Sequence, residues 1–141
     1  MSNADQMIYR VAFRMAMADG KLSMNEMILL GVLARSLGLE EQEVPILEEE
    51  AERIDYAALT RVLPERADQL RLFESALLLA MADGVSDPLE WKLANRVAAA
   101  LGLDKAAAQP CLERARARLR ALASEHLLAP EIRANLAKQG L

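Results

Sequence analysis

The chain has 141 residues, a net charge of −4 and a composition that is 53% hydrophobic but only 4% aromatic. This length suits one domain with a core large enough to fold without disulfides. The lone cysteine, Cys111, is expected to be a packed, unreactive thiol. The negative charge argues against a nucleic-acid duplex as partner, because phosphate binding requires a basic face. No secretory leader and no apolar stretch of ~20 residues is found, so we expect a cytoplasmic domain without direct membrane insertion.

Alanine, leucine and methionine dominate the apolar residues, and all three are strong helix formers. The sequence therefore predicts an all-α fold of seven to eight helices. In chain order we expect helices over residues 5–19, 23–37, 45–54, 55–63, 64–83, 87–101, 104–123 and a final short helix from 130. Pro110 is expected to break or kink the helix that begins at 104.

An internal repeat organises the chain. Residues 16–39 align without gaps on residues 80–103, and 11 of these 24 positions are identical. We interpret this as a duplicated helix-turn-helix unit, with repeats at about 5–39 and 69–103. Helices over 104–141 complete a single domain, 1–141, in which the two units are expected to be related by a pseudo-twofold axis.

Each repeat has the same pattern of helix-ending and helix-starting residues at the joint between its two helices. A glycine that can adopt the left-handed conformation ends the first helix. A capping residue, followed three positions later by a glutamate, begins the second helix, which is the capping-box pattern. The residues in question are Gly20, Ser23 and Glu26 in the first joint, and Gly84, Asp87 and Glu90 in the second.

Capping does not explain the aspartate at each joint. Asp19 and Asp83 are expected in the last turn of a helix, where a negative charge opposes the helix dipole at a cost of about 0.3–1 kcal/mol. Hydrogen bonds from amides of the turn would compensate this charge, and so would a bound cation. The available donors are oxygen atoms, which suit calcium, magnesium or manganese more than zinc.

One joint alone supplies too few ligands for an EF-hand. With Asp19 at loop position 5, Gly20 and Glu26 fit positions 6 and 12. Positions 1 and 3 then become Met15 and Met17, which cannot bind calcium. A pseudo-twofold arrangement would bring the carboxylates of both joints into one neighbourhood, where they would repel strongly without a cation.

The two Ala-Asp-Gly joints, each with a glutamate seven residues after the aspartate, resemble the TerB-like tellurite-resistance domain, which also precedes J-domains in DjlA-type co-chaperones. The resemblance covers about residues 5–125. It implies an all-α fold, a metal site built from acidic residues of both repeats, and a place in bacterial stress systems with membrane-associated protein partners. Carried over by position, the metal site comprises Asp19, Glu26, Asp83 and Glu90, with Ser23 and Asp87 in supporting positions. Because the cap is Ser23 in the first repeat and Asp87 in the second, the two repeats are not expected to bind ions equally.

These observations predict a non-enzymatic module that binds a divalent cation within a stress-response or envelope-associated assembly. The alternative is a metal-free protein interaction scaffold in which the joints serve only as helix caps. A third, weaker hypothesis is a small carboxylate metallohydrolase, which would need an open cleft beside the acidic cluster. The sole histidine, His126, lacks the spacing of a di-iron bundle, and no nucleophile triad or phosphate loop is recognisable.

Overall fold

The structure, a computed structural model, describes residues 3–82 and 88–124. Within these ranges it contains seven α-helices, two short 3-10 helices and no strand, which confirms the predicted fold class. The elements are α1 (Asn3–Ala16), α2 (Met24–Ser36), α3 (Val44–Glu50), η1 (Ala51–Arg53), η2 (Tyr56–Ala58), α4 (Leu59–Val62), α5 (Arg66–Ala80), α6 (Pro88–Ala100) and α7 (Lys105–Ser124). The helix predicted from residue 130 lies outside the described residues.

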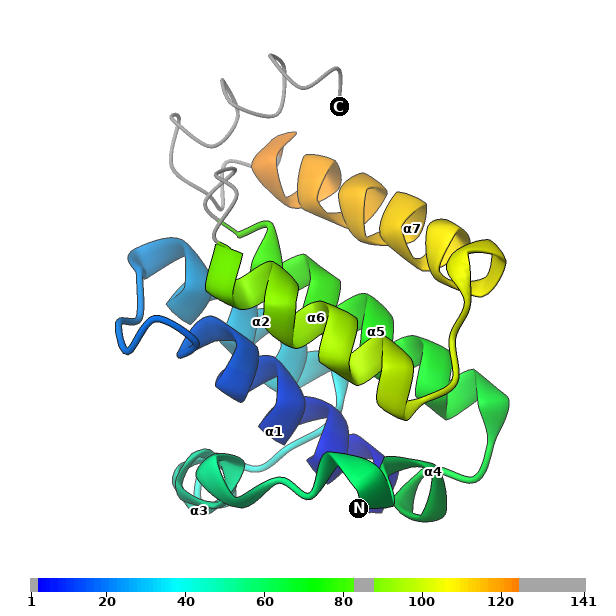
Figure 1. Ribbon diagram of the computed structural model, residues 1–141. Coiled ribbons are helices and arrows are strands. Elements are labelled where there is room, and N and C mark those ends of the chain that lie inside the picture. The colour runs from blue at the N-terminus through cyan, green and yellow to red at the C-terminus, as the bar shows by residue number, and fades with distance from the viewer. Residues whose placement is uncertain (1–2, 83–87, 125–141) are drawn as a thin grey trace.

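Helices α1 and α5 lie side by side at the centre of the molecule and run in the same direction (Figure 1). An ion pair near their starts joins Arg71 Nη2 to Asp5 Oδ1 at 3.1 Å. Helices α2 and α6 each pack against both central helices, α7 covers α5, and α3 covers α1. Because α1 and α5 are parallel, their C-terminal ends lie at the same end of the molecule (Figure 1).

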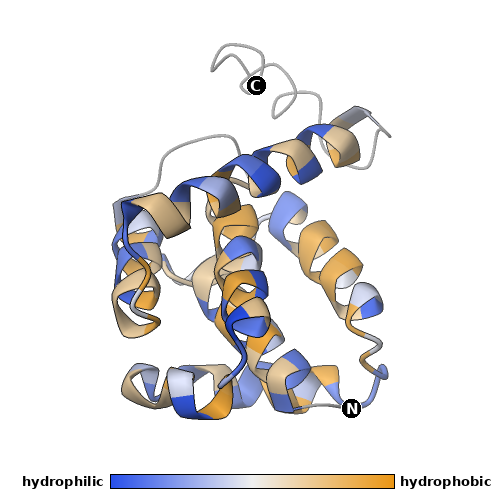
Figure 2. Cartoon of the chain, turned by 90° about the vertical axis from the view of Figure 1, so that its right-hand side faces the viewer, coloured by the Kyte–Doolittle hydropathy of each residue, from blue (hydrophilic) through white to orange (hydrophobic). Residues whose placement is uncertain are grey.

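The apolar C-terminal half of α5 explains why this helix lies at the centre. Every residue from Ser75 to Ala82 is buried, and a helix that is apolar on all sides must be covered on all sides. The other helices carry hydrophobic residues on their inner faces and hydrophilic residues outside (Figure 2). In α1, for example, Val11 and Met15 are fully buried four residues apart. In the described part of the chain, no helix is both long and apolar enough to cross a membrane.

The helices of the two predicted repeats have matching bounds. At the offset of 64 residues, Met24–Ser36 corresponds to Pro88–Ala100, and the end of α1 at Ala16 corresponds to the end of α5 at Ala80. The duplication itself stays a prediction, although the matching bounds agree with it.

The second helix of each repeat ends at a glycine. Gly38 and Gly102 adopt positive φ angles of 71° and 68°. The amides of the following residues, Leu39 and Leu103, donate to the carbonyl five residues earlier at 3.0 and 2.9 Å. This is the Schellman arrangement, in which glycine closes the helix and the next leucine turns back toward the core.

The expected break at Pro110 does not occur, because α7 is a single helix from Lys105 to Ser124. A proline in a helix removes one backbone hydrogen bond. Here that loss falls near the start of the helix, where Asp104 Oδ1 accepts from the Ala107 amide at 2.9 Å. Packing of buried residues at helical spacing, among them Cys111, against α5 then holds α7 in place.

Candidate functional site

The first joint, residues 17–23, is a closed turn. Helix α1 ends at Ala16, and exposed Asp19 lies three residues beyond it, so the prediction that Asp19 belongs to the last helical turn is wrong. The regular helix ends here because the amides of Ala18 and Gly20 bond only three residues back, to Met15 O at 3.2 Å and to Met17 O at 2.9 Å. Asp19 Oδ1 accepts from the Lys21 amide at 3.0 Å. The aspartate is thus compensated by an amide of the turn, one of the two possibilities that the sequence left open.

The capping box of the first joint is confirmed. Ser23 Oγ accepts from the Glu26 amide at 3.1 Å, and Glu26 Oε1 accepts from the Ser23 amide at 2.9 Å. Gly20 has a φ of 82°, as a left-handed turn residue requires. The Glu26 side chain is only 3% exposed. Glu26 is buried because it lies at the start of α2, where its carboxylate accepts from the Ser23 amide and is held against the turn.

The second joint is described only where α6 begins. Pro88 is the first residue of α6, and Glu90 is 6% exposed, close to the value for Glu26. The remaining predicted residues of this joint, Asp83 and Asp87, lie outside the described residues. Two matching glutamates therefore occupy buried positions at the starts of α2 and α6.

The predicted metal ligands that the structure describes do not form a site on their own. Among residues 3–82 and 88–124, no group of three or more histidine, cysteine, aspartate or glutamate side chains is placed to hold a metal ion. Asp19, Glu26 and Glu90 all belong to these ranges. A metal site at the joints would therefore depend on Asp83 and Asp87, and it stays a prediction.

A groove of about 540 Å³ lies at the joint end of the molecule, between the end of α1 and the first turns of α6. We call it the basic groove. Its lining residues are Arg14, Ala18, Leu89, Lys92, Leu93, Asn95 and Arg96. Three of these side chains are positively charged, and none is a carboxylate. The groove thus has a charge opposite to that of the chain as a whole.

The positive charges of the basic groove are not neutralised by the described part of the chain. None of Arg14, Lys92 and Arg96 forms an ion pair with a described residue. Arg14 Nη1 donates to Met17 O at 3.3 Å, and the Arg96 guanidinium lies 4.5 Å from the centre of the Tyr56 ring. Burial raises the pKa of the Tyr56 phenol, and the two arginines oppose that rise. The three charges are therefore available to an anionic ligand.

The surroundings of the basic groove add apolar surface. Leu89, on its rim, is 54% exposed. A second hollow of about 400 Å³ shares Arg14 and Ala18 with it and is bounded by Glu52 on η1. A ligand that fills the basic groove would therefore meet positive charge and an exposed leucine together.

The basic groove was not predictable from a local sequence motif. Arg14 and Lys92 belong to different repeats, and no local motif indicates that α1 contacts α6. One signal was available, because Lys92 and Arg96 are four residues apart and so share a face of α6. Like charges at this spacing repel each other mildly, so the pair points to a surface that meets an anionic partner.

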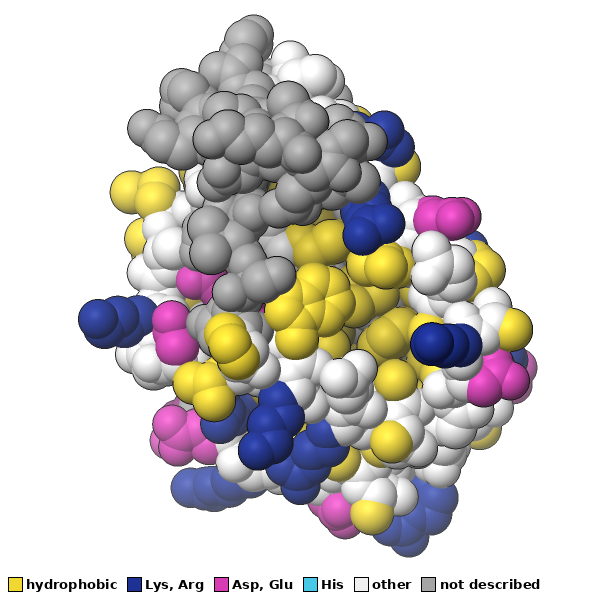
Figure 3. All heavy atoms as spheres, turned by 45° about the horizontal axis from the view of Figure 1, so that its top comes forward, with side chains coloured by type: hydrophobic (Ala, Val, Ile, Leu, Met, Phe, Trp, Pro, Cys, Tyr) yellow, Lys and Arg dark blue, Asp and Glu magenta, His cyan; other side chains and the backbone are white. Residues whose placement is uncertain are grey.

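A further hollow of about 150 Å³, between α5, α6 and α7, is mostly apolar. Figure 3 shows a group of hydrophobic side chains exposed on this face of the molecule. Trp91 lines this hollow and packs against the core.

Comparison with known proteins places the chain in a family. The family described as "Tellurite resistance protein TerB" matches residues 45–117, which is just over half of the chain. The match runs from α3 into α7 and includes Asp83, Asp87 and Glu90, but it does not extend to the first joint. No curated protein and no solved structure shows significant similarity. The family match agrees with the all-α architecture and the resemblance drawn from the joints, and the chain belongs to the TerB family.

Proposed function

We propose that this chain is a non-enzymatic interaction module whose basic groove binds an acidic, amphipathic segment of a protein partner. The observation that carries this proposal is a set of three positive side chains, Arg14, Lys92 and Arg96, that lie beside exposed Leu89 and form no ion pair with residues 3–82 or 88–124. Family membership supports a place in a stress-response assembly of the tellurite-resistance type. A partner in such an assembly that is attached to the membrane would present its acidic segment to this groove.

The chemistry of the groove favours a peptide segment over a bare inorganic anion. Exposed ion pairs contribute only about 0.2–1 kcal/mol each, so three of them give orientation and a faster association more than affinity. Apolar contact with Leu89 and Leu93 would supply the remaining binding energy, since burial of apolar surface yields about 25 cal/mol per Å². The expected motif therefore combines aspartates or glutamates with one or two large apolar side chains.

The test uses a synthetic acidic helical peptide of glutamates and leucines, with a composition-matched scrambled peptide for comparison. NMR titration of the full chain should shift signals of Arg14, Leu89, Lys92 and Arg96. The Lys92→Glu/Arg96→Glu variant should weaken binding at least about tenfold, because each reversal converts an attraction into a repulsion. Affinity should also fall as ionic strength rises.

The matched control is Arg53→Glu/Arg61→Glu, which reverses two exposed charges outside the groove. This variant should bind the peptide within about twofold of the wild type, since neither arginine lines the groove and exposed charges without direct contact contribute little. Equal losses in both variants, or signal shifts that avoid the groove, would contradict the proposal.

A second candidate function is a divalent-cation site shared by the two joints. It is supported by the matching buried positions of Glu26 and Glu90 and by the ends of α1 and α5, which lie at the same end of the molecule. Calcium, magnesium, manganese and zinc should be titrated calorimetrically into the wild type and into Asp19→Asn/Asp83→Asn. Binding that the double variant abolishes would support the site. An absence of binding, or equal binding in both proteins, would leave the joints as helix caps only.

A further inference from the structure

Helix α2 presents an outer face that is almost without charge. We call this face the α2 stripe. Its members recur at helical spacing and are Met24, Met27, Ile28, Gly31, Val32 and Arg35. Met24 is 68% exposed and Met27, one turn later, is 45% exposed. Single exposed apolar residues are common, but apolar residues that gather on one helix face indicate an interaction surface.

The fold does not require an apolar face at this place, as α6 shows. At the offset that brings the bounds of α2 onto those of α6, the three half-buried positions in the middle of the stripe are occupied by Lys92, Asn95 and Arg96. All three are exposed. Helix α6 thus has the polar outer face that is usual for a surface helix. The apolar stripe is therefore a particular property of α2.

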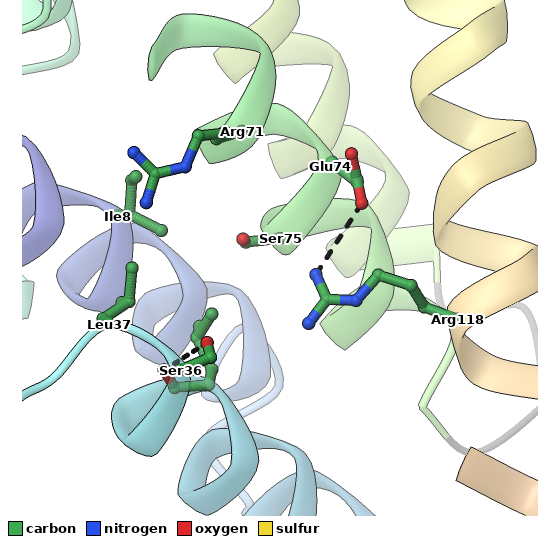
Figure 4. Close-up of a pocket in the computed structure, with 8 residues that line it drawn as sticks. Ile8, Ser36, Leu37, Arg71, Glu74, Ser75 and Arg118 are labelled. Atoms are coloured by element: carbon green, nitrogen blue, oxygen red, sulfur yellow. Dashed lines mark hydrogen bonds and ion pairs between the residues drawn. The ribbon is translucent and has the colours of Figure 1, made fainter. Parts of the chain in front are cut away.

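The other faces of α2 are accounted for within the molecule. Leu29, Leu30 and Leu33 are buried on the face that packs against α1 and α5. Near its C-terminal end, α2 borders a cavity of about 240 Å³ opposite residues of α5 and α7 (Figure 4). The two arginines that line this cavity, Arg71 and Arg118, already pair with carboxylates. Only the α2 stripe is left largely uncovered by residues 3–82 and 88–124.

Gly31 lies in the middle of the α2 stripe. A Cβ atom at this position would meet only Arg35 Nη1, at 4.0 Å, so the packing of the chain on itself gives no reason for a glycine. A glycine within a helix costs about 0.5–1 kcal/mol relative to alanine, but it lets another element approach the backbone closely. A second helix that crosses α2 at Gly31 would use this space.

The charges that flank the α2 stripe favour a second copy of this chain as the occupant. Lys21 precedes α2 and Glu41 follows it, each ten residues from Gly31, and both are exposed. Neither forms an ion pair with residues 3–82 or 88–124. If two α2 helices cross antiparallel at Gly31, Lys21 of each copy lies at the end where the other copy carries Glu41. A twofold interface uses the same patch on both copies and so requires such self-complementarity.

We propose that the α2 stripe is the interface of a twofold homodimer, in which two antiparallel α2 helices cross at Gly31 and pack their exposed methionines between them. Helix α2 has 13 residues and is therefore about 20 Å long. One helix face of this length is smaller than the about 800 Å² per partner of a standard interface. The dimer should therefore be weak, with a Kd of about 10–100 μM. This inference is independent of the basic groove and of the metal site.

Sedimentation velocity of the full chain between about 5 μM and 1 mM tests the dimer. The sedimentation coefficient should rise with concentration, and the NMR signals of the Met24 and Met27 methyl groups should shift with it. Met27→Glu should weaken dimerisation at least about tenfold, because each copy would bury a charge in the interface. This variant should still fold, since a glutamate in the first turn of α2 suits the helix dipole.

The matched control is Leu89→Glu, because Leu89 is also an exposed apolar residue but lies on α6, in the basic groove. It should dimerise within about twofold of the wild type, since it lies outside the α2 stripe.

A charge exchange tests the antiparallel arrangement. Lys21→Glu should weaken the dimer about three- to tenfold, because two ion pairs become repulsions. Lys21→Glu/Glu41→Lys should restore dimerisation to within about twofold of the wild type. The proposal is overturned if the chain stays monomeric up to about 1 mM, or if Met27→Glu dimerises as well as the wild type. It is also overturned if Leu89→Glu loses as much affinity as Met27→Glu, or if the charge exchange binds no more tightly than Lys21→Glu.

Discussion

The phenol of Tyr9 in α1 donates a hydrogen bond of 2.9 Å to Glu48 Oε2 in α3, across 39 residues of chain. The tyrosine is 2% exposed, so this bond ties the short helix α3 to the core. Burial is the first cause that raises the pKa of Tyr9, and the hydrogen bond to Glu48 and the charge of Glu48 raise it further. The folded state therefore keeps the phenol protonated at pH values where a free tyrosine ionises.

Tyr9 should make stability fall at high pH. Above about pH 10 the phenol of the unfolded chain ionises while that of the folded chain does not. The free energy of unfolding should then decrease by up to about 1.4 kcal/mol per pH unit from this group, and the contribution should be intact below pH 10. Urea unfolding between pH 8 and 11 measures this slope, which should be shallower in Tyr9→Phe. An identical slope in both proteins would contradict the assignment.

The capping box should stabilise α2 measurably. Ser23→Ala removes the acceptor for the Glu26 amide and should lower the free energy of unfolding by about 1 kcal/mol. Ser124→Ala is the control, because that exposed hydroxyl bonds only to Ala121 O of its own helix. The control should stay within about 0.5 kcal/mol of the wild type. A larger effect of the control than of Ser23→Ala would contradict the role of the cap.

Two glycines should respond oppositely to alanine. Gly38 has a φ of 71° with open space where a Cβ would stand, so Gly38→Ala should cost about 1–2 kcal/mol from backbone conformation alone. Gly31 lies within α2, and its Cβ would meet only Arg35 Nη1 at 4.0 Å. Gly31→Ala should therefore raise stability by about 0.5–1 kcal/mol. Thermal unfolding of both variants checks the signs, and a destabilising Gly31→Ala would show that the space at α2 is smaller than described.

Cys111 should report on unfolding. The thiol is fully buried, and burial raises its pKa although nearby Arg114 opposes the rise. A buried thiol with a raised pKa reacts slowly, since the thiolate is the nucleophile. Labelling with a thiol reagent at pH 8 should be far slower in buffer than in denaturant, and the destabilising Gly38→Ala should accelerate it. Equally rapid labelling with and without denaturant would mean that α7 does not cover this site.

Local chemistry made much of the fold predictable. The Leu-Gly-Leu ends, the Ser23 and Glu26 capping box and the start of α6 at Pro88 depend only on residues within a few positions of each other. Each of these signals acts through the backbone of its own turn, so no distant partner is needed. The same reasoning went wrong at Asp19 and Pro110, where the position of the helix end and the packing of α7 outweighed the local preference.

By itself, the sequence determined an all-α chain with a repeated pair of helices, and it directed attention to the acidic residues at the joints. Only the tertiary structure decided that Asp19 bonds to its own turn and that Arg14 and Lys92 line one groove. The reason is physical. Helix caps are interactions between near neighbours along the chain, whereas a groove or cavity is made by side chains of different helices, and their meeting depends on how the whole core packs.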